Sequence, residues 1–222
     1  MRSMWWKRVL IWFVRITGFI PFLILFTTKV FYENKKIQSA KIKGGAIVVS
    51  NHNSVWDVAV MLFVLWRRCP RCLTAEIMYK KNPFFTFFLN AIGCIKVDRE
   101  NHDLSFIDKC CKILEKGGLV EVYPESRIPN KGESKPLPFK PSTIAMALES
   151  GAPIIPVYND GVYFSKKRNG VIIGTPFYAR EYYDNNLSER ENVEIITEKL
   201  RNRIIELGNE LERQQTKKEK KG

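Results

Sequence analysis

The sequence predicts a single α/β domain, a sheet flanked by helices, preceded by a membrane-associated segment. Short β-branched runs alternate with helical patterns from Ala46 onward, which is typical of this fold class. The 222 residues, 45% hydrophobic and 27% charged, suit one domain with an appendage. The same composition excludes a disordered chain and a polytopic membrane protein. We expect the segment at 1–36, the domain at 37–213 and a basic tail at 214–222.

The N-terminal segment is apolar but interrupted. Residues 9–28 carry one charge, at Arg15, while Gly18 and Pro21 fall in the middle of the run. Because proline inside a helix removes a hydrogen bond and kinks it, we expect two short helices bent near residues 18–21 and lying in the membrane interface. Basic residues on both sides favour this arrangement, on the cytoplasmic face of the inner (plasma) membrane. A single crossing and a cleaved signal peptide are the alternatives.

The net charge of +13 lies mostly at the two ends of the chain. Residues 1–43 hold nine Lys or Arg and one acid, residues 214–222 hold four Lys and one Glu, and the body between them is nearly neutral. The N-terminal basic residues stand among tryptophans and aliphatic residues, which suits an anionic membrane surface better than a phosphate groove. We therefore expect no nucleic-acid partner, and we interpret the Lys-rich tail as a solvated helix end.

Local patterns predict each element of the domain. Ala46–Ser50 is a β-branched run after two glycines and reads as a buried strand. Residues 104–116 place apolar side chains on one helical face and stop at a Gly-Gly pair. The same reasoning predicts strands at 73–75, 94–97, 119–123, 154–158 and 171–174, and helices at 57–66, 84–92, 143–150 and 193–213.

The cysteines predict no metal site. Cys69 and Cys72 have the spacing of half a zinc ribbon, but Cys110 and Cys111 are adjacent where a second spaced pair is needed. We interpret all five cysteines as reduced thiols. We expect neither a metal nor a resident cofactor.

The sharpest chemical feature is a histidine followed five residues later by an aspartate. His52 comes directly after the first predicted strand, where α/β folds place reactive groups. His52 and Asp57 cannot project together from one straight helix, but they can meet if His52 lies in the loop and Asp57 in the first helical turns. A carboxylate on one imidazole nitrogen fixes the tautomer and leaves the other nitrogen to take a proton. Because no Gly-x-Ser-x-Gly nucleophile is present, the imidazole would activate a substrate hydroxyl; the alternative is a surface histidine beside a helix-capping aspartate.

Three further loops would bring cations to the same edge of the sheet. One predicted strand carries Lys96 and is followed by Arg99, another leads to Arg127, and Lys140 precedes the next helix. Guanidinium groups suit phosphate because their planar fork binds two oxygens. The second histidine, His102, stands in a polar loop and is interpreted as part of a helix cap.

Four blocks follow one another along the chain: Asn51-His-x-x-x-x-Asp57, Gly93…Asp98-Arg99, Pro124-Glu125…Arg127 and Ala152-Pro-Ile-Ile-Pro-Val157. Over about residues 40–160 they resemble the glycerolipid acyltransferases, most of all the bacterial 1-acylglycerol-3-phosphate (lysophosphatidate) acyltransferases. The resemblance implies a single acyltransferase-type domain with a central mixed sheet flanked by helices, after a two-helix membrane motif. The third block is one residue shorter than the family's Pro-Glu-Gly-Thr-Arg, and Ser126 would supply its hydroxyl.

The resemblance also implies a role for each matching residue. It implies that His52 is a general base and Asp57 its partner. Arg99 and Arg127, with Lys96, would bind the glycerol-phosphate group. Glu125 would order the site, and Lys140 would be the basic position ahead of a helix.

The implied reaction makes phosphatidate for phospholipid synthesis. An acyl group passes from a thioester of acyl-carrier protein or coenzyme A to the free hydroxyl of lysophosphatidate, without an acyl-enzyme or a metal. The implied partners are this membrane lipid, the acyl donor and the anionic membrane surface. One alternative is an acyltransferase acting on another lysophospholipid, glycerol 3-phosphate or a lyso aminolipid. A second is a non-catalytic lipid-binding protein of the membrane surface.

Overall fold

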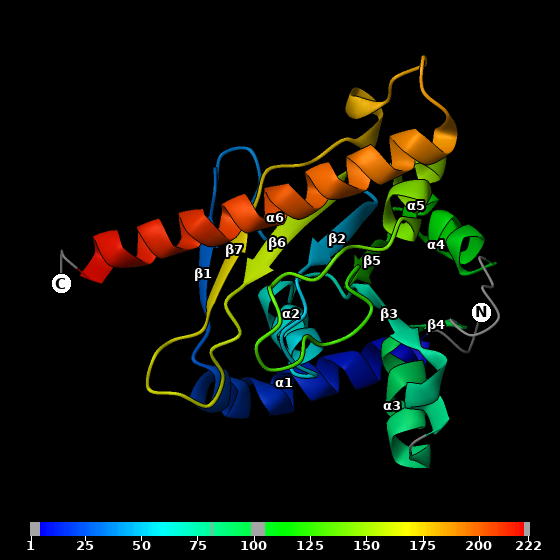
Figure 1. The fold of residues 1–222 in the computed structure, drawn as a ribbon. Coiled ribbons are helices and arrows are strands. Elements are labelled where there is room, and N and C mark those ends of the chain that lie inside the picture. The colour runs from blue at the N-terminus through cyan, green and yellow to red at the C-terminus, as the bar shows by residue number, and fades with distance from the viewer. Residues whose placement is uncertain (1–4, 81, 99–104, 220–222) are drawn as a thin grey trace.

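The computed structural model describes residues 5–80, 82–98 and 105–219 (Figure 1). Its helices are α1 (Trp5–Phe26), α2 (Asp57–Val64), α3 (Pro83–Ile92), α4 (Ser105–Glu115), α5 (Ser142–Ser150) and α6 (Glu189–Glu219), with 3-10 helices η2 (Glu76–Lys80) and η3 (Ala179–Tyr182). Its strands are β1 (Lys29–Tyr32), β2 (Ala46–Ser50), β3 (Arg71–Ala75), β4 (Ile95–Val97), β5 (Leu119–Val122), β6 (Ile154–Asn159) and β7 (Gly170–Ile173). Every strand and α-helix that the sequence predicted after residue 45 is present.

The strands form one mixed sheet, which confirms the predicted α/β class. Across the described ranges the sheet has seven strands in the order β1-β7-β6-β2-β5-β3-β4. The five strands from β6 to β4 are parallel, whereas β7 is antiparallel to β6, and β1 is parallel to β7. β2 lies between β5 and β6, so the loops that leave these three strands open at one edge of the sheet.

Helices cover both faces of the sheet (Figure 1). α4, α5 and α6 pack on one face, and α1 and α2 pack on the other. β2 contributes to both cores, because Ile47 and Val49 point to the first face while Ala46 and Val48 point to the second. A parallel strand buried on both sides therefore reads as the unbroken apolar run seen in the sequence.

The helix α1 corrects the expected N-terminal segment. Residues 5–26 form one continuous helix, so the prediction of two short helices bent near residues 18–21 was wrong. Gly18 marks a close approach between α1 and α2, since a Cβ at this position would lie 3.1 Å from Cζ of Phe63, a residue of α2. Packing of α1 against α2 and α3 supports the helix through Pro21.

Arg15 fastens α1 to the end of α2. Its side chain is 5% exposed, and its guanidinium donates to the carbonyl oxygens of Leu62 (3.1 Å), Arg68 (3.0 Å) and Trp66. The first carbonyl lies in the last turn of α2, where intrahelical donors run out, and the other two lie in the turn that follows the helix. The one charge of the apolar run therefore faces the protein.

The opposite face of α1 is apolar and exposed. Large side chains spaced three or four residues apart are roughly half or more exposed: Val9, Trp12, Phe13, Ile16, Phe19, Ile20, Ile24 and Leu25. We call these eight residues the α1 stripe. None of the helices in the described ranges is long and apolar enough to cross a membrane.

The edge strand β1 was not predicted. It lies within residues 1–36, which the sequence suggested as the membrane-associated segment, yet it pairs with β7 from Lys29↔Gly170 to Tyr32↔Ile173. A four-residue strand directly after a long apolar run has no period of its own, so only its distant partner reveals it.

Candidate active site

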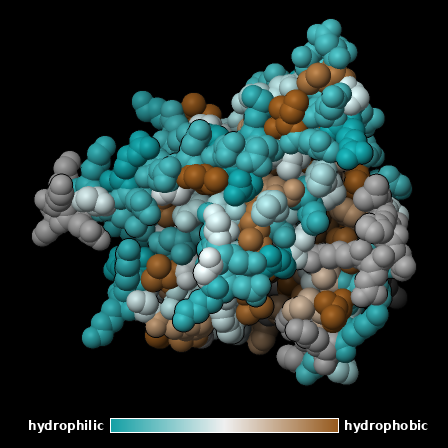
Figure 2. All heavy atoms as spheres, viewed as in Figure 1, coloured by the Kyte–Doolittle hydropathy of each residue, from teal (hydrophilic) through white to brown (hydrophobic). Residues whose placement is uncertain are grey.

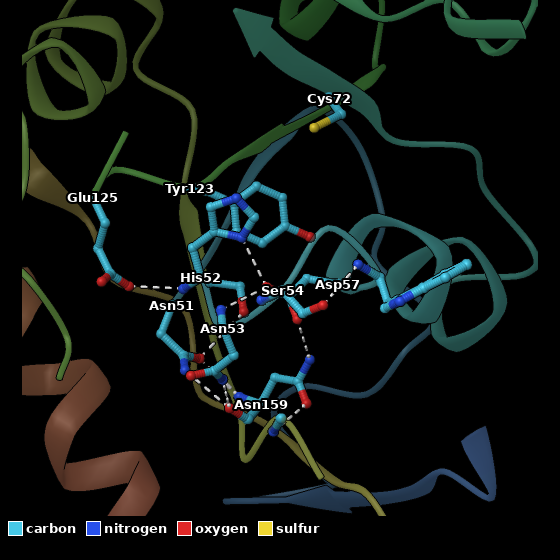
Figure 3. A network of polar contacts seen from close by, with 12 residues as sticks. Asn51, His52, Asn53, Ser54, Asp57, Cys72, Tyr123, Glu125 and Asn159 are labelled. Atoms are coloured by element: carbon cyan, nitrogen blue, oxygen red, sulfur yellow. Dashed lines mark hydrogen bonds and ion pairs between the residues drawn. The ribbon is translucent and has the colours of Figure 1, made fainter. Parts of the chain in front are cut away.

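His52 and Asp57 meet at the carboxyl end of β2. His52 lies in the loop that leaves the strand, and Asp57 is the first residue of α2. The imidazole Nδ1 lies 2.8 Å from Oδ2 of Asp57, whose side chain is fully buried (Figure 3). Because the loop turns between the two residues, both side chains point into the same space.

The carboxylate of Asp57 is held on both oxygens. Oδ2 also accepts hydrogen bonds from the backbone N–H groups of Asn53 (2.7 Å) and Ser54 (2.9 Å). Oδ1 accepts from Nδ2 of Asn159 (3.3 Å) and from the hydroxyl of Tyr163. Burial, followed by the charge of Asp57, raises the pKa of Tyr163, so this phenol stays a donor. The charge of the aspartate is thus dispersed over fixed donors, and its position is set from two sides.

Asn159 also ties β6 to the histidine loop. The amide of Asn51 donates to the carbonyl of Asn159 (2.9 Å) and accepts from its backbone N–H (2.8 Å). Nδ2 of Asn53 donates to the same carbonyl (2.7 Å). These contacts fix the backbone on both sides of His52.

Glu125 joins the histidine loop to the long loop after β5. Its Oε1 accepts from the backbone N–H of His52 (2.7 Å; Figure 3). Its Oε2 accepts from the backbone N–H of Leu137 (2.7 Å). Burial raises the pKa of Glu125, although both hydrogen bonds oppose the shift. The glutamate therefore contacts the backbone of His52 and leaves the imidazole free for Asp57.

Tyr123 and Glu121 line the other side of the imidazole. The ring centroids of Tyr123 and His52 are 4.6 Å apart with a 31° tilt (Figure 3). The phenol hydroxyl donates to Oε1 of Glu121. Glu121 is 1% exposed, and burial raises its pKa to about 8, against the opposing hydrogen bond from Tyr123. At neutral pH the Glu121 side chain is mostly an uncharged carboxylic acid.

An apolar cavity of about 510 Å³ opens beside His52. Its walls come from α2, β3, η2 and α3, with Leu62, Phe63 and Leu89 among them, and its polar lining includes Glu121 and Tyr123. A mostly apolar cavity with a few polar groups near its mouth suits a fatty chain whose reactive end lies at the imidazole.

Of the basic residues expected at the site, Arg127 and Lys140 lie near it, whereas Lys96 lies at the far edge of the sheet. Arg127 lines the cavity mouth, and its guanidinium makes two bonds to the carboxylate of Glu133, at 2.7 and 2.8 Å. Lys140 is exposed near the site, where its backbone N–H donates to the carbonyl of Pro124 (2.9 Å). Lys96 lies on β4, three strands or about 14 Å from β2, and its ammonium is 2.9 Å from Glu76.

Two residues singled out in the sequence, Arg99 and His102, lie outside the described ranges. Within those ranges no group of His, Cys, Asp or Glu is arranged to hold a metal ion. No disulfide joins any of the five cysteines, all of which lie in the described ranges, and Cys69, Cys72 and Cys94 line the cavity. Burial raises the pKa of Cys94 to about 11, so this thiol is protonated and a poor nucleophile at neutral pH.

Sequence reasoning missed Asn159, Tyr163 and Glu121. Asn159 ends the strand beside β2, so the rule that places reactive groups at adjacent carboxyl ends would have found it. Glu121 is an acid in an otherwise apolar strand, which is itself a signal of an unusual environment. Tyr163 stands in an irregular loop with no periodic pattern, and its contact with Asp57 spans 106 positions in the chain.

Residues 29–159, more than half of the chain, match the family model described as Acyltransferase. The chain belongs to the acyltransferase family. It is 30% identical over 137 residues to the 1-acyl-sn-glycerol-3-phosphate acyltransferase of Bacillus subtilis (strain 168), covering 60% of this chain and 66% of the relative. It is 25% identical over 126 residues to the Homo sapiens 1-acyl-sn-glycerol-3-phosphate acyltransferase beta, covering 56% and 44%. The resemblance seen in the four blocks is therefore confirmed.

The fold has a counterpart among solved structures. The 1-acyl-sn-glycerophosphate (LPA) acyltransferase from Thermotoga maritima superposes with a TM-score of 0.63 at 20% identity, over 91% of this chain and 81% of the other. At this identity the likeness shows a shared fold. The chain spans about half to two thirds of the length of the curated relatives named above.

The third block of this chain contains a residue in the left-handed conformation. Ser126 has φ +63°, the left-handed conformation that glycine adopts without strain. The family's block has glycine directly after the glutamate, which is the position of Ser126.

Proposed function

We propose that the protein is a membrane-associated O-acyltransferase that moves an acyl group from an acyl thioester to the free hydroxyl of 1-acylglycerol 3-phosphate. The observation that carries this proposal is the fully buried Asp57 on Nδ1 of His52 at the mouth of an apolar cavity. The family match supports the reaction type, and the relatives named above support the acceptor.

In the proposed reaction, His52 is the general base. Asp57 holds Nδ1 as the protonated nitrogen, so Nε2 is the nitrogen that accepts the proton of the acceptor hydroxyl. The hydroxyl oxygen bonds to the thioester carbonyl carbon, the carbon–sulfur bond breaks, and the proton passes from Nε2 to the departing thiolate. Asp57 stabilises the transient imidazolium, and its four other donors keep it in place.

The cavity would hold the fatty chain and so place the thioester at the imidazole. Converting binding of the chain into alignment of the reacting atoms lowers the barrier without a covalent intermediate. The donor is a thioester of acyl-carrier protein or coenzyme A. No resident cofactor takes part in this scheme.

Basic groups at the cavity mouth would hold the acceptor phosphate. Arg127 is the best placed, because its fork already binds the two oxygens of Glu133 in the geometry that two phosphate oxygens would adopt. In the proposal, phosphate displaces the Glu133 carboxylate, with Ser126 and Lys140 beside it. Arg99 and Lys96 remain proposed binders, and Lys96 would have to approach from the β4 side.

The α1 stripe would place the enzyme on the membrane. Its apolar side chains lie on one face while Arg15 and Phe22 on the other face are buried, which is the pattern of a helix lying in the interface. We propose attachment at the cytoplasmic face, where acyl thioesters meet the lipid acceptor.

The test is acyl transfer by the purified protein with labelled acyl-carrier-protein and acyl-coenzyme A thioesters and lysophosphatidate. We expect phosphatidate as product, and a loss of about 10²–10⁴-fold in kcat for His52→Ala, the usual contribution of a general base. Asp57→Asn should also lose activity, whereas Asp108→Asn, which removes an exposed carboxylate on α4, serves as the matched control.

Full turnover by a folded His52→Ala protein would contradict the proposed chemistry. A panel with glycerol 3-phosphate, other lysophospholipids and a lyso aminolipid tests the acceptor. Preference for one without a phosphate, together with indifference to Arg127→Ala, would replace lysophosphatidate as the substrate. Binding of lipid with no transfer from either donor would favour the non-catalytic alternative.

A further inference from the structure

In the loop between β6 and β7, only Tyr163 has a part in the reaction proposed above, through its hydrogen bond to Asp57. It leaves the sheet and lies beside the C-terminal end of α1, as the yellow loop near the blue helix in Figure 1. It carries an exposed aromatic residue, Phe164, followed by the three exposed basic residues Lys166, Lys167 and Arg168. We call residues 161–168 the aromatic–basic loop.

Phe164 extends the apolar surface of α1. Its ring lies 5.3 Å from that of Phe26, at the end of α1, and 5.6 Å from that of Trp56, which lines the cavity mouth. Phe26 is buried beneath them, whereas Phe164 is 58% exposed and Trp56 is 46% exposed. In Figure 2 apolar residues gather along the lower edge, where α1 runs in Figure 1. Trp56 and Phe164 thus form an exposed apolar cluster at the C-terminal end of α1, where the α1 stripe ends, beside the cavity that Trp56 lines.

The backbone of Phe164 indicates that its exposure is not incidental. Its φ is +53°, in the left-handed region that bulky residues rarely adopt and that glycine or asparagine occupies more easily. An aromatic ring held in solvent on a strained backbone costs stability twice. Such strain is typical of functional positions.

The charges of the loop identify what this surface meets. Lys166, Lys167 and Arg168 form no ion pair with any residue in the described part of the chain, and they stand next to exposed aromatic rings. Basic side chains bordering an apolar surface complement a bilayer with anionic headgroups. An acidic carrier protein would match the charges, but it would leave the long α1 stripe uncovered.

We propose that the aromatic–basic loop is a second membrane-contacting element beside α1. Phe164 enters the boundary between headgroups and acyl chains of an anionic bilayer, and the three basic side chains contact its headgroups. The next residue toward the site, Tyr163, donates to Asp57, so the contact brings the dyad and the cavity mouth to the lipid surface. The inference rests on the proposed function only in that the substrate is a membrane lipid.

The test is equilibrium binding of the full chain to sedimented vesicles of phosphatidylcholine with phosphatidylglycerol, and of phosphatidylcholine alone. Phe164→Asn keeps a residue suited to positive φ while removing the ring, and we expect about tenfold weaker partitioning. The triple variant K166Q/K167Q/R168Q should lose on the order of 100-fold on the anionic vesicles, about fivefold for each charge. The matched control K109Q/K112Q/K116Q removes three exposed charges from the α4 region on the opposite face of the sheet and should change binding by less than about twofold.

Equal losses for the loop triple variant and the α4 triple variant would overturn the proposal, because only net charge would then matter. Unchanged binding of Phe164→Asn would overturn the insertion of the ring. Unchanged vesicle binding by the loop triple variant, with a selective loss of transfer from acyl-carrier protein, would assign the loop to the donor protein instead. Acyl transfer to a short-chain, monomeric lysophosphatidate without vesicles reports separately on the proposed function, and we expect the loop variants to retain it.

Discussion

Replacing Glu121 by glutamine should flatten the pH dependence of the protein's stability. Glu121 is 1% exposed in the wall of the cavity, where it accepts a hydrogen bond from the hydroxyl of Tyr123. Burial raises its pKa to about 8, far above the ordinary 4.5. The folded chain therefore keeps a proton that the unfolded chain releases. Between about pH 4.5 and pH 8, the free energy of unfolding falls as pH rises, because deprotonation favours the unfolded state. Above that window both states are ionised and the dependence on this group ends.

The size of the effect follows from the two pKa values. Each unit of pKa difference is worth about 1.4 kcal/mol, so the stability contributed through Glu121 should fall by roughly 2 kcal/mol between about pH 6 and about pH 8. Glutamine is uncharged at both pH values and keeps an oxygen for Tyr123. Its second amide hydrogen adds a constant cost in a buried site, and that cost cancels when the two pH values are compared.

Chemical denaturation of the wild type and Glu121→Gln at both pH values measures this difference. The wild type should lose roughly 2 kcal/mol more than the variant on moving from the lower to the higher pH. Parallel slopes for the two proteins would show that Glu121 is ionised in the folded state. The reasoning about its burial would then be refuted, whatever the absolute stabilities.

Two further contacts make equally direct predictions. Tyr163→Phe removes one donor from Asp57 and should lower kcat/KM about tenfold, with little change in fold as seen by circular dichroism. The control, Tyr178→Phe on an exposed ring, should have no effect. Equal activities of the two variants would show that the remaining donors suffice to orient the aspartate. Arg15→Met should lower the free energy of unfolding by about 2–4 kcal/mol in denaturant titrations, because several carbonyls at the end of α2 lose a charged donor. The exposed Arg67→Met is its control, and a loss no larger than the control's would mean that α1 is held by apolar packing instead.

The pairing of His52 with Asp57 could be anticipated from five positions of sequence. The position of each residue depends on its neighbours in the chain: His52 follows a buried strand and Asp57 begins the next helix.

Lys96 shows the limit of the same reasoning. It follows the rule of cations near strand ends, but the order of strands puts β4 at the far edge of the sheet, where Glu76 holds the ammonium. The order of strands depends on which segments pack together across the whole domain, and no local sequence pattern encodes it.

Arg15 shows the same limit at the N-terminus. In the sequence it is one charge in an apolar run, and Gly18 and Pro21 suggest a bend. In the folded chain α2 offers free carbonyls to Arg15 and a phenyl ring against Gly18, so the helix continues and turns its charged side inward. The partner helix lies about 50 positions away, beyond the reach of any periodicity argument.

Taken alone, the order of residues determined the α/β class, nearly every strand and helix after residue 45, the family and the pairing of His52 with Asp57, because each depends on contacts within a few positions. Folding in three dimensions decided the rest: the joining of β1 to β7, the donors from Asn159 and Tyr163 to Asp57, and the acid of Glu121 inside the cavity. The strand pairing and the contacts to Asp57 join segments more than 100 positions apart, where pairing depends on the packing of the entire core.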